Sequence, residues 1–323
     1  MKIIKYLLMT ASMTLAMYAH ASSDSYPEHP IRTIVPFAPG GNADVTARLV
    51  TDALSKKLGQ PFVIENKSGA GGLVGGTAVA RAKPDGYTIM SGTGGPIFAS
   101  AVVAGTRAPY TLRDLAPIGR ISTVPLLLVV NSKSPYSTFD QFAASSKKRS
   151  GKLSVGHAGH ATTNHVSVLQ LQKALKTTFI VTPYKGSSPA IQDLIGNQID
   201  AVSAEATACL QYVKSGQLRA LAIIGSKRLP SLPNVPTMSE LKIQGVNVTT
   251  FAGMMAPAHT PQNVINQLSQ ALSEVLHDAD FIDHLERLGG VPAYLPPVKF
   301  SAFLVGEKNK YTRLVEEGLI EVK

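Results

Sequence analysis

The sequence has few of the residues on which several kinds of protein depend. It contains one cysteine, Cys209, no tryptophan, and only 21 acidic residues against 31 basic ones. A single cysteine cannot form a disulfide within the chain, so core packing must supply the stability. Because Cys209 lies far from the N-terminus, a lipid-modified N-terminal cysteine is excluded as well. The apolar content of 44% is too high for a disordered chain.

Beyond the N-terminus no apolar run is long enough to suggest a membrane span. Residues 1–21 have the layout of a secretory signal peptide. Lys2 and Lys5 form a basic start, residues 6–17 are mostly apolar, and residues 19–21 read Ala-His-Ala, a typical cleavage site. The apolar run is short for a membrane anchor, which needs about 20 residues. We therefore expect cleavage before Ser22 and export of the mature chain.

The surplus of basic residues gives a formal net charge of +10, or +8 once Lys2 and Lys5 are removed. A basic surface suits nucleic acid, acidic membranes or small anions. Nucleic acid is not expected as a partner, because the chain is exported and has no motif that combines basic with aromatic residues. The charge fits the attraction of a small anion best.

From residue 31 onward, short strand-like runs alternate with amphipathic helical runs. Residues 31–37 are strand-like, and apolar side chains recur at helical spacing in residues 45–58. The alternation restarts at the aliphatic run 126–130, and helices dominate after residue 261. This order predicts two α/β units with parallel strands covered by helices. Since no low-complexity linker separates the units, we expect strands to join them.

Two segments have the character of anion-binding loops. The first loop, residues 36–44, follows a strand, contains Gly40 and Gly41, and opens a helix near Asn42. The second loop, residues 156–165, also joins a strand to a helix and carries Thr162 and Thr163. Free backbone N–H groups and the helix dipole favour an anion at such a place, although a capped turn without ligand has the same sequence. If both loops face one cleft, they suit a ligand with two acidic ends.

Other chemistries have weaker support. Residues 69–76 resemble a dinucleotide-binding fingerprint, but Val74 stands where the third glycine is required. His157, His160 and His165 do not have the spacing of a zinc site, so no metal and no cofactor is expected. No G-x-S-x-G motif is present, which leaves an exported hydrolase or metalloenzyme as a remote alternative. We expect a binding protein rather than an enzyme.

At these loops the chain resembles a known family, the Bug proteins, which are periplasmic solute-binding proteins of tripartite tricarboxylate transporters. The motifs that carry the resemblance are V-P-F-A-P-G-G at residues 35–41, L-G-Q-P at 58–61, G-A-G-G at 69–72, P-D-G-Y-T at 84–88, P-Y-K-G at 183–186, G-Q-L-R-A-L-A at 216–222 and V-P-T at 235–237. They follow the family order over essentially the whole mature chain. Together they are highly specific.

The resemblance implies an α/β, two-lobed periplasmic binding protein of the type II-like, Venus-flytrap kind, with lobes joined by two crossover strands. Residues 26–122 plus 251–323 would form lobe 1, and residues 123–250 lobe 2. The lobes would close around a small carboxylate, a di- or tricarboxylate or an aromatic acid. The mature protein would be a periplasmic monomer that serves membrane transporter subunits. A sensor that signals to a membrane histidine kinase would have the same fold and site, and stays open as an alternative.

The resemblance also implies which residues meet the ligand. Backbone amides and ordered waters of residues 38–42 would hold one carboxylate, and residues 159–165 the other end. Ala204 stands where the family often has an Asp, so an amino-substituted ligand is not expected. The expected ligand-binding residues are Phe37, Ala38, Pro39, Gly40, Gly41, Asn42, Asp44, Ser91, Thr93, Gly159, His160, Ala161, Thr162, Thr163, His165 and Ala204.

Overall fold

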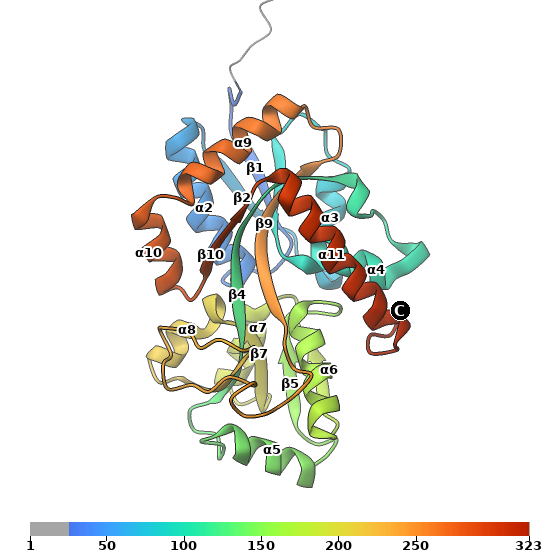
Figure 1. Ribbon diagram of the computed structural model, residues 1–323, viewed down its shortest axis with the longest axis vertical. Helices are drawn as coiled ribbons and strands as arrows, with labels where there is room; N and C mark the ends of the chain where they lie inside the picture. The colour runs from blue at the N-terminus through green and yellow to red at the C-terminus, as the bar shows by residue number, and fades with distance from the viewer. Residues whose placement is uncertain (1–25, 323) are drawn as a thin grey trace, which may run out of the picture.

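The computed structural model describes residues 26–322 and shows two α/β lobes, one above the other in Figure 1. The signal peptide expected at residues 1–21 lies outside the described residues. The upper lobe contains β1 (Ile31–Val35), α2 (Asn42–Leu58), β2 (Phe62–Asn66), η1 (Ala70–Gly72), α3 (Leu73–Ala80), β3 (Thr88–Gly92), η2 (Gly95–Ala99), α4 (Ser100–Ala104), η3 (Gly105–Arg107), η4 (Leu112–Asp114), α9 (Gln262–Val275), α10 (Ala279–Arg287), β10 (Val291–Leu295) and α11 (Pro297–Glu316). The lower lobe contains α5 (Phe139–Lys148), β5 (Ser154–His157), α6 (Thr163–Leu175), β6 (Ile180–Pro183), α7 (Ser187–Ile195), β7 (Ala201–Glu205), α8 (Ala206–Lys214) and β8 (Leu218–Ile224).

Two strands run through both lobes, β4 (Leu115–Asn131) and β9 (Thr249–Pro257). The upper sheet has the order β2-β1-β3-β9-β4, with β10 also paired to β4, and its first three strands are parallel. The lower sheet has the order β4-β7-β5-β6, with β8 on the other side of β4. The α/β, two-lobed fold expected from the sequence is therefore confirmed.

The long strand β4 changes partners in its middle. Residues 115–125 pair with β9, whereas residues 126–131 pair with β8, and residues 126–129 also with β7. The ladder of hydrogen bonds thus connects all ten strands, but the exchange between Pro125 and Leu126 separates an upper sheet from a lower one. The residue limits of the two lobes as independent units stay a prediction.

The alternation of side chains along β4 builds both faces of the lower core. Leu126, Leu128 and Val130 pack with α5 and α6, whereas Leu127 and Val129 pack with α7 and α8. All five side chains are fully buried. Burying each aliphatic side chain contributes about 1.5–3 kcal/mol. In the upper lobe, α2, α9 and α10 cover one face of the sheet, and α3, α4 and α11 cover the other.

The apolar cluster under α11 extends beyond the upper lobe. It includes Phe300 and Tyr311 of α11 and Ile320 of the C-terminal segment, together with Ala161 and Val166 of the lower lobe. Ile320 is only 1% exposed. The lobes therefore touch through the C-terminal helix as well as through the two long strands.

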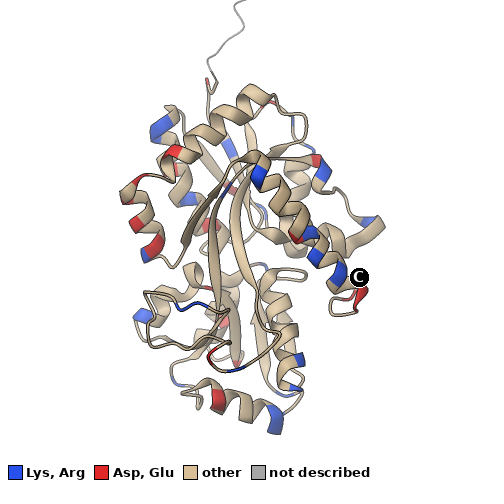
Figure 2. Cartoon of the chain, in the orientation of Figure 1, with Lys and Arg blue, Asp and Glu red and all other residues tan. Residues whose placement is uncertain are grey.

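The surface carries both signs of charge. Figure 2 shows Lys, Arg, Asp and Glu interspersed on the helices of both lobes, rather than gathered by sign in this view. Within residues 26–322, no helix has both the length and the apolarity that a membrane crossing requires.

Candidate functional site

The first loop joins the carboxyl end of β1 to the start of α2. Gly40 has a φ of +78°, in the left-handed region that favours glycine, whereas Gly41 is extended with a φ of −84°. Among the described residues, no protein group accepts a hydrogen bond from the backbone amides of Gly41, Asn42 or Ala43. These amides form the positive end of a 17-residue helix, which is the arrangement that binds anions.

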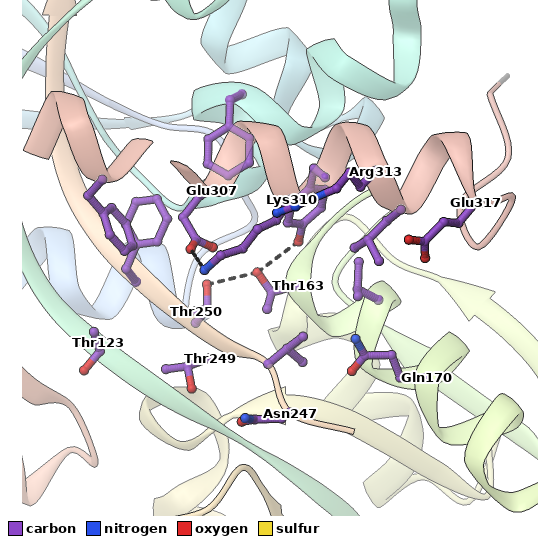
Figure 3. A pocket seen from close by; sticks show the side chains of 18 residues that line it. Thr123, Thr163, Gln170, Asn247, Thr249, Thr250, Glu307, Lys310, Arg313 and Glu317 are labelled. Carbon is purple, nitrogen blue, oxygen red and sulfur yellow. Dashed lines mark hydrogen bonds and ion pairs between the residues drawn. The ribbon is translucent and has the colours of Figure 1, made fainter. Parts of the chain in front are cut away.

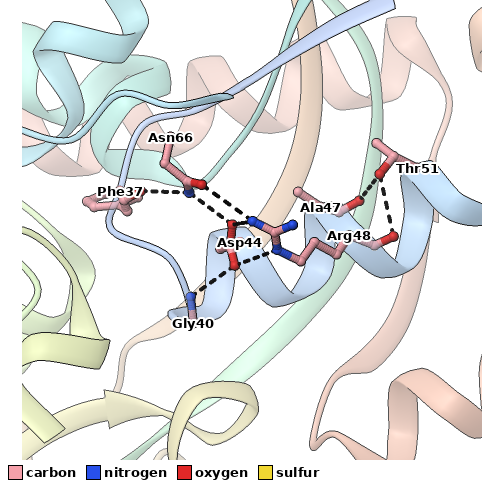
Figure 4. Close-up of polar contacts among 7 residues, drawn as sticks. All are labelled: Phe37, Gly40, Asp44, Ala47, Arg48, Thr51 and Asn66. Atoms are coloured by element: carbon pink, nitrogen blue, oxygen red, sulfur yellow. Dashed lines mark hydrogen bonds and ion pairs between the residues drawn. The ribbon is translucent and has the colours of Figure 1, made fainter. Parts of the chain in front are cut away.

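Asp44 holds the first loop in shape through hydrogen bonds within the upper lobe (Figure 4). Its buried carboxylate accepts hydrogen bonds from the Gly40 amide at 2.9 Å, from Arg48 at 2.9 and 3.0 Å, and from Asn66 Nδ2 at 2.9 Å. Burial alone would raise the pKa of Asp44, but these donors outweigh it and leave that pKa lowered. These bonds give Asp44 a positioning role within the upper lobe, and its expected contact with a ligand stays a prediction.

The second loop joins β5 to α6 and is capped from within. Thr162 Oγ1 donates to the Gly159 carbonyl at 2.6 Å and accepts from the His165 amide at 3.3 Å, which ends the loop and starts the helix. The His165 ring stacks on that of His157, with centroids 4.5 Å apart, and the His160 ring lies tilted beside it, with centroids 4.8 Å apart. No group of His, Cys, Asp or Glu within residues 26–322 is placed to hold a metal ion.

Two residues of the second loop contact the C-terminal part of the chain. The Thr163 hydroxyl faces the hydroxyls of Thr250 and Tyr311, at 3.4 and 3.5 Å, on the side of α11. His160 Nε2 lies 3.3 Å from the carbonyl oxygen of Glu321 in the C-terminal segment. Both side chains thus have protein partners, and their expected contacts with a ligand stay predictions.

The two lobes are closed onto each other at these loops. The Ala38 amide donates to the Lys185 carbonyl at 3.0 Å, and Thr207 Oγ1 donates to Asn42 Oδ1 at 2.8 Å. A Cβ added at Gly95 would lie 3.5 Å from the Thr162 methyl and 3.6 Å from the Phe37 ring, so the first and second loops share one interlobe boundary. We call this boundary the cleft.

The main partner of the first loop is a third strand-to-helix turn, which the sequence marked as a family motif at residues 183–186 but not as part of the binding site. Gly186, with a φ of +142°, precedes Ser187 and Ser188 at the start of α7. A Cβ on Gly40 would lie 3.2 Å from Ser188 Oγ, and one on Gly41 would lie 3.7 Å from the Ser187 amide. The pattern strand, glycine, serine and helix carries the same signal as the two loops that were chosen, so it could have been found.

Ala204 lies in β7, in the core of the lower lobe. Its methyl group is fully buried in the apolar core of the lower lobe, with Leu127 and Val202. The neighbouring Glu205 is the buried acid, and it accepts a hydrogen bond from Ser187 Oγ at 2.5 Å. Burial raises the pKa of the Glu205 carboxyl above its usual range. The acid nearest to residue 204 is thus Glu205, whose carboxyl is bonded to Ser187, and the expectation against amino-substituted ligands stays a prediction.

Two buried donors at the ends of upper-lobe elements lack partners. Within residues 26–322, Asn42 Nδ2 and Ser91 Oγ have no hydrogen-bond partner, and the two residues are 3% and 1% exposed. Thr93, after β3, is buried as well. Because the other atom of the Asn42 amide already bonds Thr207 across the cleft, its unpaired Nδ2 lies at the cleft. An unsatisfied buried donor costs about 1–3 kcal/mol, which an acceptor on a ligand would recover.

The mouth of the cleft contains a cavity of about 570 Å³. Both lobes line it, with Ala38, Ser68, Ala70, Gly71, Gly159, His160, Pro183, Tyr184, Lys185 and Pro189. The remaining predicted residues lie around it: Pro39 belongs to the first loop, and Ala161, with a φ of +61°, to the second.

Two α/β lobes crossed by two long strands, with helix N-termini facing one cleft, define a periplasmic solute-binding protein. The chain belongs to the family described as the tripartite tricarboxylate transporter family receptor, whose model matches residues 46–319. It is a family of receptors rather than of enzymes. Protein BugT of Bordetella pertussis is 34% identical over 311 residues, which cover 96% of this chain and 95% of BugT.

Solved structures agree with this assignment. The periplasmic binding protein BugD is 34% identical and superposes with a TM-score of 0.86, over 92% of this chain and 99% of BugD. MatC from Rhodopseudomonas palustris, solved with bound malate, is 32% identical with a TM-score of 0.83, over 90% of this chain and all of MatC. The resemblance to Bug proteins is therefore confirmed.

Proposed function

We propose that the protein captures a small carboxylate in the cleft and delivers it to the membrane subunits of a tripartite tricarboxylate-type transporter. The observation that carries the proposal is the group of unpaired donors at the start of α2. The amides of Gly41, Asn42 and Ala43 and the buried Asn42 Nδ2 all lack protein acceptors among the described residues. A carboxylate, directly or through a bridging water, would satisfy them.

The N-terminus of α7 supports the same ligand class from the opposite lobe. Its first residues, Ser187 and Ser188, lie against Gly40 and Gly41. Two helix N-termini therefore face each other across the cleft, and an anion between them would lie at the positive end of both dipoles. The malate bound to MatC, a relative of similar length and fold, is a small carboxylate of the proposed class.

The cellular part of the proposal follows from the N-terminal segment and the family. We propose that residues 1–21 are removed on export and that the mature chain acts as a monomer in the periplasm. Mass spectrometry of the periplasmic fraction should give Ser22 as the first residue, and size-exclusion chromatography should give the monomer mass.

A screen of the purified mature protein against mono-, di- and tricarboxylates and aromatic acids tests ligand capture. We expect at least one carboxylate to raise the melting temperature and to bind in calorimetry with one site. Asn42→Leu should weaken that binding, because it removes the unpaired donor. The matched control is Asn263→Leu, at an exposed position of α9. No thermal shift with any carboxylate would overturn the proposal.

A further inference from the structure

The lobes meet at a second place, between α11 and α6, which we call the α11 seam. Tyr311 Oη donates to Thr163 Oγ1 at 3.5 Å, and Thr163 Oγ1 donates to Thr250 Oγ1 at 3.4 Å. Both distances are at the long end for hydrogen bonds between hydroxyls, so these contacts hold the seam weakly. On the same seam, Ile320 packs with Ala161 and Val166.

A cavity of about 490 Å³ lies in the α11 seam (Figure 3). It is within the size range of small-molecule sites. Its lining comes from α11, from α6, from the long strands and from the turn after β3: Gly94, Phe98, Thr123, Thr163, Val166, Gln170, Asn247, Val248, Thr249, Thr250, Phe251, Phe303, Glu307, Lys310, Tyr311, Arg313, Leu314 and Glu317. Since both lobes contribute walls, the shape of the cavity depends on how the lobes are arranged.

The lining combines aromatic rings with charges that cancel. Phe251 contacts Phe98 and Phe303, with ring centroids 6.5 and 5.1 Å apart. Two acidic and two basic side chains line the cavity, and one of each, Glu307 and Lys310, form an ion pair at 2.5 Å. The lining therefore offers apolar burial without a net preference for either sign of charge.

One polar atom of the cavity lining is an unpaired hydrogen-bond acceptor among the described residues. Gln170 Oε1 is buried and has no hydrogen-bond partner in the part of the chain that the structure describes. Figure 3 shows the Gln170 side chain at the wall of the cavity, on α6. An amide oxygen accepts but does not donate, so a molecule that satisfied it would bring an O–H or N–H group.

We propose that this cavity is a second binding site, separate from the cleft, for an uncharged molecule with a flat apolar body and one O–H or N–H donor. Phenols and aromatic amides have this chemistry. The body would pack on the partly exposed Phe303 ring, behind which the rings of Phe98 and Phe251 are buried. The donor would bond Gln170 Oε1 once the half-buried side chain turns this oxygen into the cavity, because the oxygen is covered in the structure. A molecule held by both lobes stabilises the arrangement that forms the cavity, which is the closed one.

Fluorine NMR with 4-fluorophenol and fluorobenzene tests the site, because the two probes differ in one hydroxyl. We expect 4-fluorophenol to bind the full-length mature protein at least about fivefold more tightly, the effect of one hydrogen bond. In Gln170→Leu that difference should vanish. The control is Gln267→Leu, because Gln267 Oε1 is also buried and unpaired but lies on α9, away from the cavity.

The outcomes separate clearly. Equal affinity of the two probes for the unaltered protein, or the same probe affinities in Gln170→Leu and Gln267→Leu, would overturn the proposal. If the cavity does not recognise the charge of the bound molecule, Lys310→Gln should change the affinity for 4-fluorophenol by less than about twofold. A large change would assign the site to ions instead and would equally overturn it.

The effect on closure is tested apart from the site, since it rests on the proposed function. With malate or another carboxylate found in the screen, saturating 4-fluorophenol should tighten carboxylate binding, and the carboxylate should tighten 4-fluorophenol binding by the same factor. Probe binding without this reciprocity would refute the coupling and leave the site. A failure of every carboxylate would count against the proposed function alone.

Discussion

The two adjacent glycines of the first loop predict opposite responses to the same substitution. Gly40 has a left-handed φ of +78°, and Gly41 has a φ of −84° and a ψ of 174°, which any residue adopts. A serine at residue 40 would be strained by about 1–2 kcal/mol. A serine at residue 41 stands at the N-cap of α2, where serine is preferred. We expect Gly40→Ser to lower the free energy of unfolding by about 1–2 kcal/mol relative to Gly41→Ser.

Urea unfolding followed by circular dichroism measures this difference. In thermal unfolding, each kcal/mol of this difference would shift the melting temperature by about 2–4 °C, the range for domains of about 150–250 residues. Ligand affinity provides an independent readout, because a Cβ on Gly40 would lie 3.2 Å from Ser188 Oγ across the cleft. Adding Ser188→Ala to Gly40→Ser should restore part of the affinity but none of the stability. Equal losses of stability at residues 40 and 41 would refute the argument from backbone conformation.

Three further predictions concern polar groups at the cleft. The pKa of Asp44 is lower in the folded protein than in the unfolded chain, where it is about 3.9. The ionised carboxylate therefore stabilises the fold above about pH 3.9, and this contribution is lost as the pH falls through the folded-state pKa. Asp44→Asn should therefore flatten the acid limb of urea stability measured from pH 3 to 7, and an unchanged limb would contradict this role. Glu205 has a raised pKa, so its ionisation destabilises the fold as the pH rises from about 4.3 towards the folded value. Glu205→Gln keeps an acceptor for Ser187 and should be neutral or stabilising at pH 7 by the same assay, whereas a clear loss of stability would show that the charge is needed. Thr207→Val removes the bond to Asn42 across the cleft, and small-angle scattering should show a larger radius of gyration without ligand than for the unaltered protein; identical values would show that this bond does not hold the cleft closed.

The sequence was most informative where periodicity decides the structure. The strand–helix alternation and the aliphatic run 126–130 predicted two α/β units, and β4 places that run at the centre of the lower sheet. The loops at residues 36–44 and 156–165 were also found, because glycines and hydroxyl residues between a strand and a helix mark such turns. Both loops reach the cleft.

The direction of individual side chains could not be read from the sequence. Successive residues of a strand face opposite sides of the sheet. The Ala204 side chain therefore faces the apolar core, whereas the next side chain, Glu205, faces Ser187. Thr163 turns towards Thr250 because α6 presents its first residue to the α11 side. The α11 seam itself depends on contacts between residues about 150 positions apart, for which no local pattern gives a signal.

Because both sheets share β4, an insertion or deletion within this strand affects the whole lower sheet. Side chains alternate with a period of two, so one inserted or deleted residue reverses every later side chain of a strand. A single-residue insertion between Pro125 and Leu126 would leave the pairing of residues 115–125 with β9 intact, yet would turn Leu126, Leu128 and Val130 towards α7 and α8. The strand thus ties the side-chain register of the lower sheet to that of the upper sheet. Length variation among relatives should therefore be found in the loops between helices and strands and be absent from this strand.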